Sequence, residues 1–179
     1  MTRAEIANIL NSGPLVGGPD QWIVVQPSAL IEVATRLKNV PELAFDNLNS
    51  VTGIDYPKEN LIRVTYHFWS YLKRHDFIVK VELPREDPHV ETLCSLWGSA
   101  NWLEREQYDL LGIKFDKHPD MRRVLLPDDW VGYPHRKDYE EAGGYHGISN
   151  TRESPLEGFV RLDSLRKEAT KEAQTETKH

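Results

Sequence analysis

Two stretches of alternating residues, 61–71 and 77–83, constrain the fold more than any other feature of the sequence. In the first stretch the apolar positions are Ile62, Val64, Tyr66 and Phe68. In the second stretch they are Phe77, Val79, Val81 and Leu83. Because neighbouring side chains of a strand point to opposite faces, this period of two predicts strands with one covered face. The short turn over 73–76 predicts that the two strands are antiparallel neighbours.

Two further strands and a helix are expected before this pair. The β-branched run 22–26 predicts a short strand, and residues 43–52 predict a longer one. Between them an apolar stripe recurs at helical spacing, at Leu30, Ala34 and Leu37. The Ser28 hydroxyl is suited to cap the start of this helix, which we expect to end near Lys38.

Residues 87–98 suggest another helix. Asp87 is suited to cap it and the following proline to occupy its first turn, and Gly98 is a natural end. Its apolar stripe is Val90, Leu93 and Trp97.

A last helix is expected from Asn101, as its cap, to Gly112, as its terminator. Glu104 lies three residues after the cap, where its carboxylate could reach back to the cap amide. The apolar side of this helix comprises Leu103, Leu110 and Leu111, so that Glu104, Arg105 and Tyr108 face elsewhere. Beyond Ile113, repeated prolines and glycines break any long helix or strand.

The sequence therefore predicts an α+β fold, with a small, mostly antiparallel sheet, helices on one face, and a long extended C-terminal arm. We assign residues 1–112 to the α+β domain, 113–139 to the arm, and 140–179 to a polar tail. The tail is too polar to offset the entropy of folding by itself, so we expect it to be disordered or ordered by a partner.

Size and charge limit the possible functions. A chain of 179 residues can form one ordinary domain with appendages. Its net charge of −6 opposes nucleic-acid binding, which depends on clustered Lys and Arg. We expect no membrane span, since no stretch approaches the roughly 18 apolar residues required, and the N-terminus lacks the apolar region of a signal peptide. Cys94, the single cysteine, cannot hold an iron–sulfur cluster alone, because clusters take about four thiolates.

Two linked runs, 104–125 and 129–139, carry the clearest information about function. The first begins Glu-Arg-Glu-Gln-Tyr-Asp-Leu-Leu-Gly, and the second ends Trp-x-Gly-x-Pro-x-Arg-Lys-Asp-Tyr. Together they resemble the motifs of the C-type subunit, also called the 30 kDa-type subunit, of proton-translocating NADH:quinone oxidoreductase, respiratory complex I. The residues that we assign to this motif and to an interface are Glu104, Arg105, Glu106, Tyr108, Asp109, His118, Pro119, Arg122, Arg123, Trp130, Gly132, Pro134, Arg136, Lys137, Asp138 and Tyr139.

The resemblance implies an accessory subunit of the hydrophilic arm, with no cofactor of its own. FMN and the iron–sulfur clusters would lie on partner subunits, and quinone would be the electron acceptor. The implied partners are the D-type subunit, which forms the quinone site, and the B-type and I-type subunits, which carry clusters, on the cytoplasmic side of the bacterial inner membrane. The sequence is consistent with this, because it contains neither a strand-borne Gly-x-Gly-x-x-Gly nor a Walker loop.

The arm itself has the composition of an interface. An extended segment cannot satisfy its own backbone amides and carbonyls, so it needs another surface. We expect the cations Arg122, Arg123, Arg136 and Lys137 to meet partner carboxylates. Aromatic anchors are available in Trp130, Tyr133 and Tyr139.

Several alternatives remain open at this point. Glu104, Arg105 and Asp109 could form a solvated helix face, with the last two paired four residues apart. The four residues Asp116, His118, Asp120 and His135 could serve a metal or an acid/base site of a free-standing hydrolase. No two of them, however, have the spacing of metal ligands on a helix. The chain could also be the equivalent small subunit of a membrane-bound hydrogenase or of a plastoquinone-linked complex.

Overall fold

A computed structural model describes residues 2–10 and 22–149 of the chain. The chain divides after Tyr139 into two compact units. In the second unit the described residues form only a small hairpin, from β7 (Gly144–Tyr145) and β8 (Ile148–Ser149). The expected tail therefore lies mostly outside the described residues. No described helix is long and apolar enough to cross a membrane.

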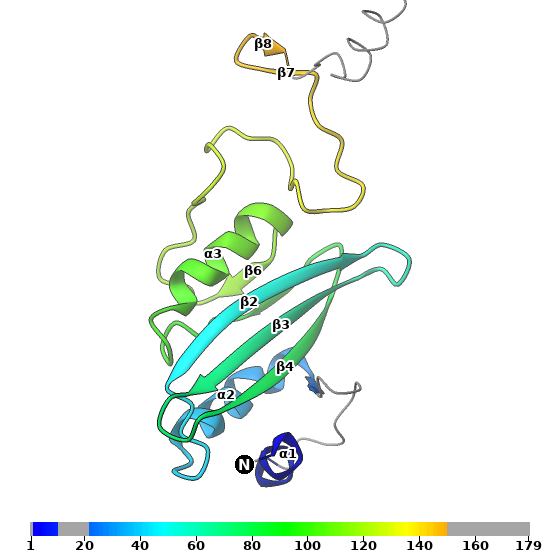
Figure 1. The fold of residues 1–179 in the computed structure, drawn as a ribbon. Helices are drawn as coiled ribbons and strands as arrows, with labels where there is room; N and C mark the ends of the chain where they lie inside the picture. Colours follow the sequence, from blue (N-terminus) through cyan, green and yellow to red (C-terminus); the bar gives the residue numbers. More distant parts are fainter. Residues whose placement is uncertain (1, 11–21, 150–179) are drawn as a thin grey trace, which may run out of the picture. The chain divides into compact units, whose positions relative to one another are not determined.

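The first unit is built on a four-stranded sheet with the order β1-β4-β3-β2 (Figure 1). Strands β2, β3 and β4 are antiparallel, whereas β1 pairs in parallel with β4. The strands are β1 (Ile23–Val25), β2 (Asn47–Tyr56), β3 (Leu61–Ser70) and β4 (His75–Pro84). The sequence prediction of a mostly antiparallel sheet is confirmed. The central strands β3 and β4 both begin and end within two residues of their expected bounds.

Helices cover one face of this sheet. The inward residues of β3 are fully buried, as the period of two predicted: Ile62, Val64, Tyr66 and Phe68. They join a single core with residues of helices α1 (Arg3–Leu10), α2 (Leu30–Asn39) and α3 (Ala100–Leu111). Burying each large apolar side chain contributes about 1.5–3 kcal/mol. Helix α1 has no counterpart among the sequence expectations.

The expected helix over residues 87–98 is wrong. The chain instead forms a short strand, β5 (His89–Glu91), which pairs in parallel with β6 (Lys114–Asp116), and then turns. The apolar residues Val90, Leu93 and Trp97 are all buried, so their spacing reflects burial from a strand and turns rather than one helical face. The Trp97 indole N–H donates to the Phe45 carbonyl at 3.2 Å, which fixes this irregular segment in the core.

The predicted cap Asp87 falls with that helix, and the other two predicted helix caps are also wrong. Ser28 lies inside a 3₁₀ turn, η1 (Pro27–Ala29), and no side chain caps the start of α2. Helix α3 begins after Ser99, so Asn101 lies in its first turn and not at its cap. Its predicted end at Gly112 is confirmed, since this glycine has a φ of 77° and a Cβ there would overlap the Tyr133 ring.

Gly53 allows α3 to approach the edge strand β2. Its amide donates to the Gln107 side-chain oxygen at 2.8 Å. A Cβ at this position would overlap the Leu111 Cδ1 methyl and lie 3.0 Å from Ile113 Cδ1. The absence of a side chain at residue 53 therefore sets the distance between the sheet and the helix that carries the motif.

We expect Gly53→Ala to lower the free energy of unfolding by about 1–3 kcal/mol, because overpacking a core contact forces side chains and backbone to shift. The matched control is Gly98→Ala, since a Cβ at Gly98 would meet nothing within 4 Å. Urea unfolding of the purified chain, followed by tryptophan fluorescence, measures both. Equal midpoints for the two variants would contradict the proposed close approach.

Candidate functional site: helix α3 and the segment that crosses it

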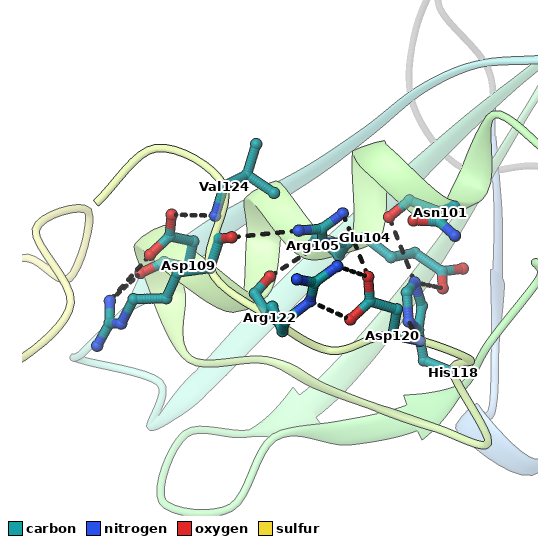
Figure 2. A network of polar contacts seen from close by, with 9 residues as sticks. Asn101, Glu104, Arg105, Asp109, His118, Asp120, Arg122 and Val124 are labelled. Atoms are coloured by element: carbon teal, nitrogen blue, oxygen red, sulfur yellow. Dashed lines mark hydrogen bonds and ion pairs between the residues drawn. The ribbon is translucent and has the colours of Figure 1, made fainter. Parts of the chain in front are cut away.

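The carboxylate of Asp109 organises the motif region. Its side chain is fully buried on α3, and its oxygens accept four hydrogen bonds from the segment that follows the helix, within residues 113–139. Figure 2 shows the bond from the Val124 amide. Asp109 Oδ2 accepts three consecutive backbone amides, from Val124, Leu125 and Leu126 at 3.0, 2.7 and 2.9 Å. Asp109 Oδ1 accepts from Arg123 Nη1 at 2.9 Å.

These donors keep Asp109 ionised. Burial by itself would raise the pKa of this carboxyl, but the three amides and the Arg123 guanidinium outweigh burial and lower its pKa. The charged form is thus the one that the fold stabilises. Asp109 supplies the hydrogen-bond acceptor that an irregular backbone segment cannot provide for itself.

Two arginines extend this network along the segment. Arg123 Nη2 donates to the Trp130 carbonyl at 3.1 Å. Arg105 is almost wholly buried and donates from Nε to the Arg122 carbonyl at 3.0 Å. Its Nη2 donates to the Arg123 carbonyl at 3.2 Å, and its guanidinium lies 4.8 Å from the Trp102 ring centre. Charged groups of α3 therefore bind backbone atoms of the segment.

Glu104 performs a similar role on the other side of α3. It is fully buried, and its Oε1 accepts the Leu93 amide at 2.8 Å while its Oε2 accepts the Thr92 hydroxyl. The Cys94 thiol lies 3.6 Å from Oε2. Burial is the main reason that the pKa of Glu104 is raised. The expected bond from Glu104 to the helix cap is wrong, because this carboxylate holds the turn after β5.

His118 completes this buried cluster. Its Nδ1 accepts the Asp120 amide at 3.1 Å, which leaves the proton on Nε2, facing the Asn101 carbonyl at 3.3 Å. Burial and the nearby Arg105 lower the pKa of His118, so its neutral form is favoured.

Cys94, Glu104 and His118 have potential ligand atoms within 4.8 Å of one another. A metal would, however, have to displace hydrogen bonds that already occupy both His118 nitrogens and both Glu104 oxygens. Burial also raises the pKa of Cys94 to about 11, which disfavours the thiolate that binds metals. The donor set therefore fits a hydrogen-bond cluster better than a metal site.

A second tether holds the end of the motif to the sheet. The buried Asp55 carboxylate accepts from Arg85 at 2.7 and 3.0 Å and from the Lys137 amide at 2.8 Å. Arg85 also binds Asp138 at 2.5 Å. Hydrogen bonds, first from Arg85, lower the pKa of Asp55. Arg136 Nε donates to the carbonyl of Leu111 at 2.8 Å, near the C-terminus of α3.

The structure changes several expectations about the motif residues. The alternative of a solvated helix face is wrong, because Glu104, Arg105 and Asp109 are all buried. Arg123 and Arg136, expected to meet partner carboxylates, bind groups of this chain instead. Residues left half-buried are Glu106, Tyr108, Trp130, Pro134 and Tyr139. Residues left exposed are Pro119, Arg122, Gly132, Lys137 and Asp138.

The residues suggested for a hydrolase do not form one site. Asp116 pairs with His89 on the exposed surface, Asp120 pairs with Arg122, and His135 is exposed. Sequence reasoning missed Asp55, Arg85 and Thr92, which lie far along the chain from the groups that they bind. No local pattern marks such residues, since only the fold brings them to the motif.

The two buried acids of α3 should respond to pH in opposite directions. The pKa of Asp109 is lower in the folded chain than in the unfolded chain, where it is about 3.9. Asp109 therefore stabilises the fold at pH values above about 3.9, and this stabilisation is lost as the pH falls through the folded pKa. The pKa of Glu104 is higher in the folded chain than in the unfolded chain, where it is about 4.3. Glu104 therefore stabilises the fold at pH values below about 4.3, and this stabilisation is lost as the pH rises through the folded pKa.

We therefore expect Asp109→Asn to cost about 3–5 kcal/mol at neutral pH, because Arg123 loses its buried partner. The difference in the free energy of unfolding between this variant and the unchanged chain should shrink as the pH falls below about 4. Glu104→Gln, the matched amide substitution, should show a deficit that shrinks as pH rises. Urea unfolding of the three proteins between acidic and neutral pH tests this, and deficits that change in the same direction would contradict it.

Comparison with known proteins agrees with the predicted resemblance. A family model described as "Respiratory-chain NADH dehydrogenase, 30 Kd subunit" matches residues 23–145. The C subunit of NADH-quinone oxidoreductase from Chloroherpeton thalassium is 43% identical over 117 residues, which is 65% of this chain and 48% of that protein. The chain thus spans about half the length of this relative.

The C subunit of F(420)H(2) dehydrogenase from Methanosarcina mazei is 44% identical over 110 residues, which is 61% of this chain and 68% of that protein. A solved structure described as Nqo5 of the trypsin-resistant fragment (1-134) has 33% identity and a TM-score of 0.56. It aligns with 65% of this chain and 94% of that chain. Motif, fold and sequence therefore agree, and the chain belongs to the family of the 30 kDa subunit of respiratory-chain NADH dehydrogenase.

Proposed function

We propose that this chain is an accessory subunit, without a redox cofactor of its own, in the hydrophilic arm of a proton-translocating NADH:quinone oxidoreductase. The observation that carries the proposal is the use of the motif charges inside the chain. Glu104, Arg105 and Asp109 are buried and bind the chain's own backbone. Side chains that bind the chain's own backbone fix the position of its outer surface, and they are not available for proton transfer to a substrate.

The positioned surface has the composition of a protein interface. Helix α3 and the following segment expose the large apolar side chains of Trp102, Leu125 and Val131, which are 62%, 61% and 85% exposed. Charged groups such as Arg122 and Lys137 are exposed on the same segment. Apolar and aromatic side chains with charged neighbours are typical of interfaces that a partner covers.

The partners that fit this role are the D-type subunit, which forms the quinone site, and the cluster-carrying B-type and I-type subunits, on the cytoplasmic side of the membrane. Electrons would pass through FMN and iron–sulfur clusters of partner subunits to quinone. This chain would contribute by holding its neighbours in register. Because Arg123 and Arg136 bind groups of this chain and Arg122 pairs with Asp120, Lys137 is the motif cation best placed to meet a partner carboxylate.

A second candidate concerns the electron donor. The relative named for F(420)H(2) dehydrogenase is as similar to this chain as the relative named for NADH. A subunit that only positions its partners would serve either donor, so the donor would be selected elsewhere in the complex. The same reasoning covers the related hydrogenase and plastoquinone-linked complexes.

Purification of the tagged chain from its native membrane tests the proposal. We expect the quinone-site and cluster-carrying subunits to co-purify in equal amounts with it. Leu125→Asp should lower the abundance of the assembled complex on a native gel by about tenfold or more, because it places a charge in a buried interface. Quinone reductase turnover per assembled complex should stay unchanged.

The matched control is Val24→Asp, which introduces the same charge at a 40% exposed residue of the edge strand β1. It should leave the abundance of the complex unchanged. Full assembly of the Leu125→Asp complex with lost turnover would contradict an accessory role. Recovery of the tagged chain without redox subunits would contradict membership of the complex.

A further inference from the structure

The turn between β3 and β4 exposes a second group of large side chains. Tyr71 is 68% exposed and Leu72 is 76% exposed. Lys73 and Arg74 follow directly, and within the described ranges neither of them forms an ion pair. The turn therefore places two apolar groups and two free cations together in water, in a chain whose net charge is −6.

Four hydrogen bonds hold this turn in place. The buried Ser70 hydroxyl donates to the Ala44 carbonyl at 2.7 Å and accepts the Lys73 amide at 3.1 Å. The Arg74 amide donates to the Ser70 carbonyl at 2.8 Å, and the Tyr71 amide donates to Asp46 at 3.1 Å. A turn held at four points loses little further freedom on binding, so its exposed side chains are preorganised.

A groove of about 750 Å³ lies beside the turn, and we call it the tip groove. Its lining residues are Asn49, His67, Trp69, Tyr71 and Arg74. The rings of Trp69 and Tyr71 are 6.4 Å apart and inclined at 76°. The lining includes no carboxylate, and the nearby Asp76 is already paired with Arg3 and His67.

We infer that the tip groove binds an extended segment of a partner subunit that carries an Asp or Glu next to an apolar side chain. The inference rests on the proposed function, which supplies the partner. The carboxylate would pair with Arg74 in a bidentate arrangement, and the apolar side chain would pack against Trp69 and Tyr71. Aromatic residues with arginine are the commonest anchors of protein interfaces.

A protein partner fits this surface better than a lipid bilayer. Anionic lipid surfaces recruit clusters of about four to eight Lys and Arg, whereas this turn offers two. A groove lined by two rings also suits a single inserted side chain.

The tip groove lies far from the tether that holds the end of the motif to the sheet. Ser70 pairs with His75 at one end of the β3–β4 hairpin, and Leu61 pairs with Pro84 at the other. The ten paired residues span about 30 Å at 3.4 Å per residue. Asp55, which tethers Lys137, pairs with Ile62 near the far end. The tip groove would therefore contact a partner far from the Asp55 tether.

A photoreactive amino acid in place of Leu72 tests the inference in the complex purified from native membranes. We expect a crosslink to one partner subunit, at a peptide that contains Asp or Glu. Arg74→Glu should reduce this crosslink by about tenfold, because it reverses the charge that faces the carboxylate. Lys58→Glu, the same reversal in the exposed turn at the other end of the hairpin, should leave it unchanged.

In the Arg74→Glu complex, the identified carboxylate residue of the partner can be replaced by Arg. Return of the crosslink in this doubly changed complex would support the ion pair directly. Adducts with lipid only, or no adduct in a complex that contains the redox subunits, would overturn the tip groove as a protein site and leave the proposed function intact. Equal loss of the crosslink in Arg74→Glu and Lys58→Glu would also overturn it. If no redox subunit co-purifies at all, both the inference and the proposed function fail.

Discussion

The buried carboxylate of Asp109 determines where the chain goes after helix α3. Three consecutive amides and one guanidinium converge on it, and without it these donors would lose their charged acceptor. Helix α3 is itself placed on the sheet by the glycine at Gly53 and the Gln107 bond. The sheet thus positions the helix, the helix positions the carboxylate, and the carboxylate positions the segment with its exposed Leu125.

The charges of the family motif make sense in these terms. A segment that lacks regular secondary structure leaves its backbone groups without internal partners, so side chains must supply them. Glu104, Arg105 and Asp109 do so from one helix, and the bonds to the ionised Arg105 and Asp109 are stronger than bonds between neutral groups. Arg85 and Asp55 hold the far end of the segment to the sheet. The result is a fixed outer surface made from a chain segment that could not fold alone.

The sequence predicted the parts of the fold that depend on local periodicity. Strands β3 and β4 followed from strict alternation, and the end of α3 followed from Gly112. The stripe of Val90, Leu93 and Trp97 misled, because a short strand followed by turns can bury residues at the same spacing as a helix. The burial of Glu104 and Asp109 could not be predicted, since their partners lie on segments that only the fold brings near. The Asp55–Arg85 tether was missed for the same reason.

Amide hydrogen exchange in the isolated chain tests most directly whether Asp109 fixes the segment before any partner binds. The amides of Val124, Leu125 and Leu126 lie in an irregular segment, and an exposed segment of this kind exchanges rapidly. We predict that these three amides are protected in the unchanged chain and lose their protection in Asp109→Asn. Rapid exchange of all three in the unchanged chain would contradict the account, because the segment would then be ordered only by its partners.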